Sequence, residues 1–401
     1  MKILILSNKL PFPLKDGGAI ATFNMLKALA TAGNQLTLLT FNTKKHFFPI
    51  DKFPDTEIPE LKLYSVNINT QPKIFPALQN FLLSSKPYIA ERFYCKHFID
   101  ALKKLLRKQQ FDLIQIEGLY MLQYIPIIRA NSKSLISYRA HNIEYEIWQQ
   151  LSENKKNKLK RLYLDNLSRR IKKYELSIIN QYDILIPISE KDALFFQKNG
   201  NKKPLFVSPV GFDTEQFKSY DKIVHKPKLY FLGSLDWLPN REGLLWFIDN
   251  CWNRLTEIYP EIELHIAGRN APPDFATQIK HKNISFHGEV EDAHAFIKDK
   301  SIMIVPLLSG SGMRVKIIEA FFMQKAVVST KLGAAGTEST DNKHLLIAEN
   351  SDEFIQKISL LINHIDKYTE IVKNATKLTL HNFDNKQIAQ KLNSFYKKLI
   401  Y

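Results

Sequence analysis

Residues 309–336 read SGSGMRVKIIEAFFMQKAVVSTKLGAAG, a pattern that predicts part of one strand–loop–helix–strand unit. The apolar spacing predicts a helix over residues 313–322 and a strand over 326–330, with a buried strand at 301–305 just upstream. A glycine turn, residues 310–312, precedes the helix. Small residues there let backbone N–H groups approach a ligand, and the helix dipole favours an anion.

Two cations, Arg314 and Lys316, fall in the first turn of this predicted helix, where acidic residues are normally favoured. Their presence suggests an external anion that carries more than one charge, and a nucleotide diphosphate fits that description. The alternative interpretation is a tight turn with exposed basic side chains.

Length and charge narrow the possibilities further. The 401 residues are enough for two or three domains, and 56 Lys+Arg against 40 Asp+Glu give a formal charge of +16. Such an excess favours nucleic acid, phosphorylated substrates or an anionic membrane face as partners. Cys95 and Cys251 have no metal-site spacing and suggest a reducing compartment. The N-terminal apolar run is too short for a signal peptide, and no stretch is long enough to span a membrane.

The N-terminal residues also have the pattern of a nucleotide-binding α/β fold. Residues 2–7 form an apolar strand without alternation, a glycine-containing loop ends at Gly17-Gly18, and a helix (20–30) and a strand (36–41) follow. The loop lacks the GxGxxG spacing, so it is weak evidence for any ligand. A second strand series begins near residue 229, and together the two series predict two doubly wound α/β domains.

A candidate catalytic histidine, His141, follows the strand predicted over residues 134–139, with Glu144 close behind. Doubly wound sheets place their chemistry just beyond the carboxyl ends of strands. His141 could donate to a ligand oxygen or accept from a hydroxyl group. A structural role for this histidine is the alternative.

Two further stretches could face a membrane. Residues 153–173 form a basic helical stretch with an apolar side, which suits either an anionic membrane surface or a solvated charged face. Its cations are Lys155, Lys156, Lys158, Lys160, Arg161, Arg169, Arg170, Lys172 and Lys173. Residues 44–100 are rich in aromatic side chains. They form either an acceptor- or membrane-facing lobe or a helical insert whose aromatics belong to the core.

Seven motifs in a fixed order identify a family. They are Gly17-Gly18, His141, VSPVGFDTEQF (207–217), FLGS (231–234), HIAGR (265–269), FHGEV (286–290) and GSGMRVKIIEA (310–320). This set resembles family 4 of the retaining glycosyltransferases, the glycosyl transferases group 1, over nearly the whole chain. The resemblance implies the GT-B fold, an α/β fold of two Rossmann-like doubly wound domains that face across a cleft.

The resemblance also implies a domain plan. Residues 1–207 would form the acceptor-binding domain, 208–222 a hinge, and 223–383 the domain that binds the nucleotide sugar. Residues 384–401 would form a C-terminal helix that crosses back to the N-terminal domain.

Individual roles follow from matches to the family motifs. Glu319 matches a glutamate that hydrogen-bonds the ribose, while its usual partner glutamate is replaced by Ser311. Ser234 replaces an arginine that normally follows Gly233, so Arg314 and Lys316 are expected to neutralise the diphosphate. His141 matches the active-site histidine. The other donor-binding residues that the resemblance implies are Gly18, Arg241, Arg269, Val290, Gly312 and Met313.

The resemblance implies a cytoplasmic, metal-independent glycosyltransferase without a cofactor, which uses a UDP- or GDP-linked sugar. Its acceptor would be a glycan or a lipid-linked glycan in cell-surface polysaccharide biosynthesis, with possible peripheral contact to an anionic membrane. The departing diphosphate is the group that needs charge stabilisation. A nucleotide-sugar epimerase of the same fold is the main alternative. A nucleic-acid-binding protein is disfavoured because no RNA-binding module is recognisable.

Overall fold

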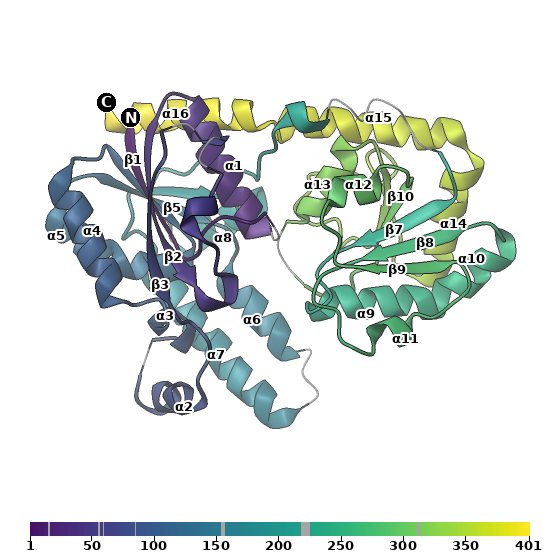
Figure 1. The fold of residues 1–401 in the computed structure, drawn as a ribbon, viewed down its shortest axis with the longest axis horizontal. Coiled ribbons are helices and arrows are strands. Elements are labelled where there is room, and N and C mark those ends of the chain that lie inside the picture. The colour runs from purple at the N-terminus through teal and green to yellow at the C-terminus, as the bar shows by residue number, and fades with distance from the viewer. Residues whose placement is uncertain are drawn as a thin grey trace. The chain divides into compact units, whose positions relative to one another are not determined.

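The chain folds into two α/β units, each built on one parallel sheet (Figure 1). A computed structural model describes residues 1–14, 17–54, 57–58, 60–84, 86–153, 157–217, 225–310 and 313–401. The first unit comprises Met1–Phe212 and Asn385–Tyr401, and the second comprises Asp213–Asp384. The two doubly wound α/β domains predicted from the sequence are therefore confirmed.

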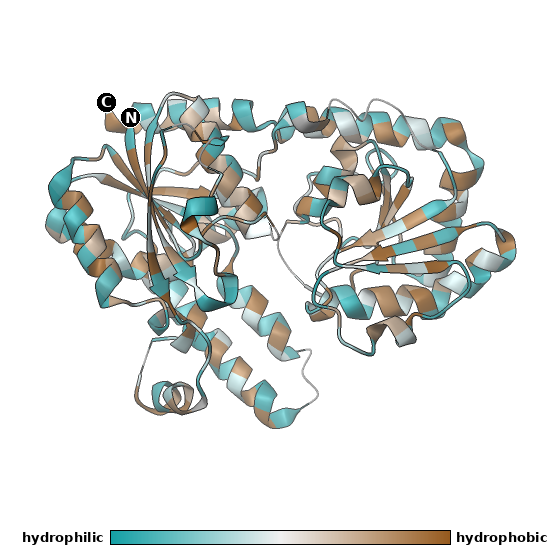
Figure 2. Cartoon of the chain, viewed as in Figure 1, coloured by the Kyte–Doolittle hydropathy of each residue, from teal (hydrophilic) through white to brown (hydrophobic). Residues whose placement is uncertain are grey.

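The sheet of the first unit has the strand order β3-β2-β1-β4-β5-β6, with all neighbouring strands parallel. The central strand KILILS is buried from its second residue onward, because helices cover both faces of such a sheet. In Figure 2 the strands of this sheet are mainly brown, whereas most helices have brown and teal faces. The strands are β1 Lys2–Ser7, β2 Gln35–Thr43, β3 Lys62–Ile68, β4 Leu113–Glu117, β5 Leu135–Ala140 and β6 Ile184–Pro187.

The helices of the first unit include one from the far end of the chain. This helix, α16 (Asn385–Ile400), packs on α1 and buries Tyr396, which confirms the expected return of the C-terminal helix to the N-terminal domain. The others are α1 Gly17–Thr31, α2 Ile74–Leu83, α3 Tyr88–Glu91, α4 Lys96–Lys108, α5 Ile125–Asn131, α6 Glu144–Glu153, α7 Lys158–Ser177 and α8 Glu190–Lys198.

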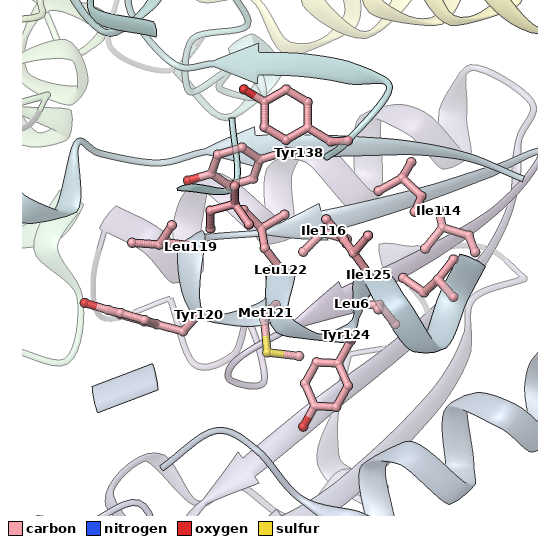
Figure 3. Close-up of a cluster of buried hydrophobic side chains, with 14 of the residues drawn as sticks. Leu6, Ile114, Ile116, Leu119, Tyr120, Met121, Leu122, Tyr124, Ile125 and Tyr138 are labelled. Atoms are coloured by element: carbon pink, nitrogen blue, oxygen red, sulfur yellow. The ribbon is translucent and has the colours of Figure 1, made fainter. Parts of the chain in front are cut away.

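A continuous apolar core supports β1 and β4 of this sheet. Leu6, Ile114 and Ile116 pack against the 3₁₀ helix Leu119–Tyr124 and the start of α5 (Figure 3). The same cluster holds Phe98 of α4 and Tyr138 of β5. The carboxyl ends of β4 and β5 are thus packed against this core on one face of the sheet.

Most of the basic stretch 153–173 lies in one helix, α7, and Glu153 is the last residue of α6. Helices α6 and α7 pack side by side, and Ser152 donates a hydrogen bond to Asp165 at 2.5 Å. Leu167 and Ile171 of α7 are buried in the core of the unit, which explains the apolar side of the pattern. Two of the predicted basic residues, Lys155 and Lys156, lie outside the described residues.

The sheet of the second unit has the order β12-β11-β10-β7-β8-β9, again with all neighbours parallel. Numbered within its own unit, this is the same doubly wound order as that of the first sheet. The strands are β7 Lys228–Leu232, β8 Glu263–Ala267, β9 Ile284–Gly288, β10 Ile302–Val305, β11 Ala326–Ser329 and β12 Leu346–Ile347.

Helices cover both faces of this second sheet. They are α9 Leu238–Phe247 with a π-helical turn Ile248–Trp252, α10 Asn253–Ile258, α11 Phe275–Gln278, α12 Ala293–Ile297, α13 Val315–Phe322, α14 Ser351–Asn363 and α15 Ile365–Asn382. None of the helices in the described part of the chain is long and apolar enough to cross a membrane.

The topology marks one position in each sheet as a ligand site. In doubly wound sheets, ligands bind beyond the carboxyl ends of strands where the strand order reverses. The order reverses between β1 and β4 in the first unit and between β7 and β10 in the second. Several of the predicted site residues follow strands at or beside these two positions.

Candidate functional site

His141 is paired with a buried glutamate in the first unit. Its Nε2 atom lies 2.5 Å from Oε2 of Glu117, the last residue of β4. The Glu117 side chain is 3% exposed and that of His141 is 16% exposed, so only the histidine reaches the surface. The same carboxylate oxygen accepts a hydrogen bond from Nη1 of Arg139 at 3.3 Å. The structure therefore places the predicted histidine in a charged group of three side chains.

The charge of Glu117 fixes the tautomer of His141. Burial opposes ionisation, but the Arg139 guanidinium, His141 and Gln115 outweigh it and lower the pKa of Glu117 to about 2. An ionised carboxylate can only accept, so the hydrogen of this contact resides on Nε2 of the histidine. In the neutral ring, Nδ1 is then the free acceptor, which suits it to receive a hydrogen bond from a hydroxyl group.

A chain of hydrogen bonds connects Glu117 to the C-terminal helix. Nε2 of Gln115 donates to Oε1 of Glu117 at 2.5 Å, and the hydroxyl of Tyr396 donates to Oε1 of Gln115 at 2.9 Å. The Tyr396 hydroxyl also lies 3.0 Å from Oγ of Ser137 on β5. Residues of β4, β5 and α16 thus hold the carboxylate that orients His141.

The start of α1 reaches the same carboxylate. Thr22 Oγ1 lies 3.5 Å from Oε2 of Glu117, and the backbone oxygen of Ala21 accepts from Arg139 at 3.2 Å. Gly18, a predicted donor-binding residue, lies one turn earlier in α1. It is therefore at the amino end of the helix that packs beside the His141 group.

A pair of glutamates links α6 to α7, since Glu144 is the first residue of α6 and Glu175 belongs to α7. The carboxylate of Glu175 accepts from the backbone N–H of Glu144 at 3.1 Å and of Tyr145 at 3.3 Å, which satisfies two free donors of that helix. Burial raises the pKa of Glu175 to about 8 in spite of these two hydrogen bonds. Glu144 accepts from the Tyr120 hydroxyl at 2.9 Å. Both carboxyl groups have a structural role in holding α6 beside His141.

In the second unit, the loop after β10 packs against a tryptophan that the sequence analysis did not single out. Gly310 has φ +110°, a conformation that favours glycine, and a side-chain carbon there would lie 2.8 Å from the ring of Trp237. The Arg314 guanidinium lies over the same ring, 5.1 Å from its centroid. Gly336, with φ +78°, approaches the backbone of Met313. Three loops thus converge around Arg314.

The position of Arg314 corrects the sequence prediction in one respect. Helix α13 begins at Val315, and Arg314 is its N-cap residue with φ −88° and ψ 77°. Only Lys316 therefore lies in the first turn. The non-helical backbone lets the Arg314 side chain stack on Trp237. Burial lowers the pKa of Arg314 to about 10, so the guanidinium is still charged at neutral pH.

Lys316 and Glu319 form an ion pair on α13. Nζ of Lys316 lies 2.7 Å from Oε2 of Glu319, three residues along the helix. The Glu319 side chain is buried, whereas that of Lys316 is half-buried. These two opposite charges offset each other within α13. A ligand phosphate would compete with Glu319 for Lys316.

A third group of predicted residues meets at the carboxyl ends of β7 and β8. Nε of Arg269 donates to Oγ of Ser234 at 3.1 Å, and Ser234 donates to Asp236 at 2.5 Å. Arg241 Nη1 donates to the backbone oxygen of Leu235 at 3.2 Å. Gly233 lies at the same point, where a side chain would collide with Asn240. The structure therefore brings together four of the predicted residues, which are Gly233, Ser234, Arg241 and Arg269.

The remaining predicted residues are more separate. Val290 follows β9, the edge strand of the second sheet, two strands away from β7. Ser311 and Gly312 lie outside the described residues. His141 and Gly18 belong to the first unit, and the other predicted site residues belong to the second. Among the described residues, no group of three or more His, Cys, Asp or Glu side chains is arranged to hold a metal ion.

Two side chains missed by the sequence analysis are central to these groups. Glu117 ends a strand next to the one that precedes His141, so strand order could have placed the pair together. Trp237 lies in the loop after the FLGS motif. A large aromatic residue in a glycine-bordered loop beside a predicted phosphate site was the available signal.

Comparison with known proteins identifies the second unit. Residues 226–364 match the family described as Glycosyl transferases group 1. The second unit thus contains a Glycosyl transferases group 1 domain. The matched region includes the Ser234 group, Trp237, Arg314 and helix α13.

One curated relative matches almost the whole chain. It is an uncharacterized 44.6 kDa protein in the cps region of Klebsiella pneumoniae, 25% identical over 400 residues. The match covers 96% of this chain and 97% of the relative. The similarity therefore extends over both units.

Solved glycosyltransferase structures have the same fold. Alr3699/HepE of Anabaena in complex with UDP matches with a TM-score of 0.70 and 15% identity, over 99% of this chain and 100% of that one. TarM of S. aureus matches with a TM-score of 0.69 and 12% identity, over 98% of each chain. Sucrose-phosphate synthase of Thermosynechococcus elongatus matches with a TM-score of 0.67 and 15% identity, over 100% of this chain and 99% of that one. The GT-B fold expected from the sequence motifs is thereby confirmed.

Proposed function

We propose that the protein is a retaining, metal-independent glycosyltransferase that moves a sugar from a nucleoside diphosphate sugar to a glycan or lipid-linked glycan acceptor. The observation that carries this proposal is the family match over residues 226–364, a region that contains the stacked pair Trp237 and Arg314. The relative in the cps region of Klebsiella pneumoniae supports a role in polysaccharide biosynthesis. The Anabaena structures that contain UDP and UDP-glucose support a uridine nucleotide.

The chemistry of the proposed reaction suits the residues present. The bond between the sugar and the diphosphate breaks, and negative charge develops on the departing phosphate oxygen. Arg314 is a preorganised cation in a buried loop, where such a charge is stabilised most strongly. Lys316 would leave Glu319 or be shared with it, and Glu319 would bind the ribose. The acceptor hydroxyl would lose its proton to the departing phosphate, so no protein nucleophile is required.

In this proposal His141 contacts the sugar or the acceptor. Because Nε2 donates its hydrogen to Glu117, Nδ1 accepts a hydrogen bond from a hydroxyl group of either substrate. Glu117 is a positioning residue, because it is buried and acts through the histidine. The role would account for a carboxylate at the end of β4 beside two basic groups.

The test starts with nucleotide binding. Thermal unfolding should be measured with UDP, GDP, ADP and their sugars, and a ligand at 100 times its Kd should add about 2.7 kcal/mol of stability. We expect UDP and a UDP-sugar to stabilise the protein, and Arg314→Ala to remove the effect. A protein stabilised by none of these nucleotides would contradict the proposal.

The preferred nucleotide sugar is then incubated with glycan acceptors and, separately, without any. Transfer should require the acceptor, persist in a chelator and retain the anomeric configuration in the product, as read by NMR. A sugar epimer formed without acceptor would instead identify an epimerase.

A further inference from the structure

One end of the first unit exposes large apolar side chains. In helix α2, Phe75 is 76% exposed and Leu83 is 79% exposed, and Leu78 and Leu82 are also exposed. At the start of α7, Leu159 is 80% exposed. We define the α2–α7 tip as Phe75, Leu78, Leu82, Leu83, Leu159 and Leu162. Within the unit, Figure 1 shows this end opposite α16.

The two helices of the tip are fastened to each other. The rings of Phe81 and Tyr163 lie 5.9 Å apart. Nη2 of Arg170 on α7 donates to the backbone oxygens of Asn80 at 3.2 Å and Lys86 at 2.6 Å, and also to that of Ser84. These contacts hold the carboxyl end of α2 against α7 and leave its other side chains outward. The exposed apolar surface is therefore part of a supported structure.

Helix α2 does not resemble a helix that serves only the core. It reads IFPALQNFLL, without a charged residue, and is apolar on nearly every side. A helix of this kind is normally enclosed by protein or lipid. Elsewhere in the aromatic segment 44–100 some aromatics pack inward, such as Phe53 and Phe98, whereas Phe47 and Tyr94 are exposed. Exposed apolar side chains are most concentrated in α2.

The charges around the tip are mainly positive, although Glu91 accepts a hydrogen bond from Ser84 at the end of α2 and Glu153 ends α6. Residues 71–90 and 154–164 contain no Asp or Glu. The same two ranges contain seven cations, which are Lys73, Lys86, Lys155, Lys156, Lys158, Lys160 and Arg161. Those among them that the structure describes are exposed. The tip thus combines apolar side chains with a positive rim.

We propose that the α2–α7 tip docks onto the surface of an anionic lipid bilayer. The apolar side chains of α2 and Leu159 enter the boundary between headgroups and acyl chains, and the surrounding cations contact anionic headgroups. The attachment is peripheral and reversible. It places the first unit at the membrane, where a lipid-linked substrate would be found, although the docking itself does not depend on the proposed reaction.

The charge pattern selects a bilayer over a second copy of the chain. A symmetric dimer through this surface would bring the same patch against itself, and so place cations against cations. Like charges in such an arrangement cost several kcal/mol. An anionic bilayer offers both complementary charge and an apolar interior.

The docking is tested by flotation of the full-length protein with vesicles. One set consists of phosphatidylcholine, and the other of phosphatidylcholine and phosphatidylglycerol in equal parts. We expect binding to the anionic vesicles at low salt, weak binding at high salt, and none to the neutral vesicles. Each cation near an anionic leaflet contributes about 1 kcal/mol, so Lys158→Gln, Lys160→Gln and Arg161→Gln together should weaken binding on the order of 10²-fold.

Matched variants show whether binding depends on the tip or on exposed charged and apolar residues elsewhere on the protein. Leu78→Gln, Leu82→Gln and Leu83→Gln together should reduce binding to background, whereas Ile365→Gln with Leu380→Gln, two exposed residues of α15, should leave it unchanged. The control for the charge changes at the tip is a variant that removes three exposed cations of α4, with the changes Lys104→Gln, Arg107→Gln and Lys108→Gln.

A reporter at the tip tests insertion directly. In Leu82→Trp, anionic vesicles should shift the tryptophan emission to shorter wavelength, and brominated lipids should quench it. The proposal is overturned if anionic vesicles do not bind, if the α4 variant abolishes binding as fully as the tip variants, or if the α2 changes instead dissociate a dimer in sedimentation equilibrium. Nucleotide-dependent thermal stabilisation is recorded on the same variants, so loss of docking is distinguished from loss of the proposed activity.

Discussion

Nε2 of His141 and Oε2 of Glu117 lie 2.5 Å apart, at the carboxyl ends of two neighbouring strands. The pair joins a solvent-reaching histidine to a carboxylate that is ionised inside the protein. Arg139, which is fully buried, balances the carboxylate charge. The histidine is therefore held in one tautomer and one orientation by groups that do not reach the surface themselves.

The first prediction concerns acid stability. The pKa of Glu117 is lowered from 4.5 to about 2 on folding, so between these pH values the unfolded state binds more protons than the folded state. Ionised Glu117 contributes roughly 3 kcal/mol to the free energy of unfolding. This contribution is complete above pH 4.5 and is lost as the pH falls toward 2. Urea unfolding at successive pH values should show this fall in the natural protein and a shallower one in Glu117→Gln.

Glu117→Gln should also be less stable at neutral pH, by about 3–5 kcal/mol, because it leaves the buried Arg139 charge unpaired. Glu57→Gln is the control, since that carboxylate is exposed. Equal acid sensitivity of Glu117→Gln and the natural protein would show that Glu117 is not ionised in the fold.

The second prediction concerns the C-terminal helix. Tyr396→Phe removes the hydroxyl that bonds Gln115 and Ser137, and leaves buried polar groups without that partner. The expected loss in the free energy of unfolding is about 1–3 kcal/mol. Tyr401→Phe, at an exposed position, should change it little. If the two variants are equally stable in urea, the hydrogen bonds of Tyr396 contribute nothing net.

The third prediction has the opposite pH dependence. Burial raises the pKa of Glu175 from 4.5 to about 8, so between these values the folded state holds a proton that the unfolded state releases. Stability should therefore decrease as the pH rises through this range. Glu175→Gln keeps one of the two oxygens that accept from the N–H groups of Glu144 and Tyr145, and it should show a smaller decrease. Exposed Glu190→Gln is the control, and a slope unchanged by Glu175→Gln would refute the assignment.

The fourth prediction concerns the stacked arginine. Arg314→Lys keeps the charge but loses the planar group that lies on Trp237, and Trp237→Leu removes the other partner. Each should weaken UDP binding about tenfold in calorimetry. Arg314→Ala should lower kcat on the order of 10²-fold. Arg254→Lys, an exposed change in the same unit, should leave both quantities unaltered. Full activity of Arg314→Ala would exclude it from diphosphate binding.

The fifth prediction concerns Glu319. Glu319→Gln keeps the shape but weakens hydrogen bonds to ribose hydroxyls, and it removes the charge that pairs with Lys316. KM for the nucleotide sugar should rise in steady-state assays. Glu338→Gln, on the surface of the same unit, serves as the comparison. An unchanged KM, with unchanged affinity for free UDP, would make the Lys316–Glu319 pair purely structural.

The sequence by itself determined the fold class and much of the candidate site. Strands such as KILILS are apolar without alternation, and that pattern is typical of a sheet covered on both faces. Glycine turns, the motif order and the histidine after β5 were visible without coordinates. Local chemistry of this kind depends on residues close together in the chain.

Tertiary structure alone decided which distant residues meet. Glu117 and His141, Tyr396 and Gln115, and Trp237 and Arg314 are brought together by strand order, the returning C-terminal helix and loop packing. It also decided that Leu167 and Ile171 of the basic stretch belong to the core while the side chains of α2 do not. An apolar pattern shows that a side chain favours burial, but whether a neighbour covers it depends on the packing of elements far apart in the sequence.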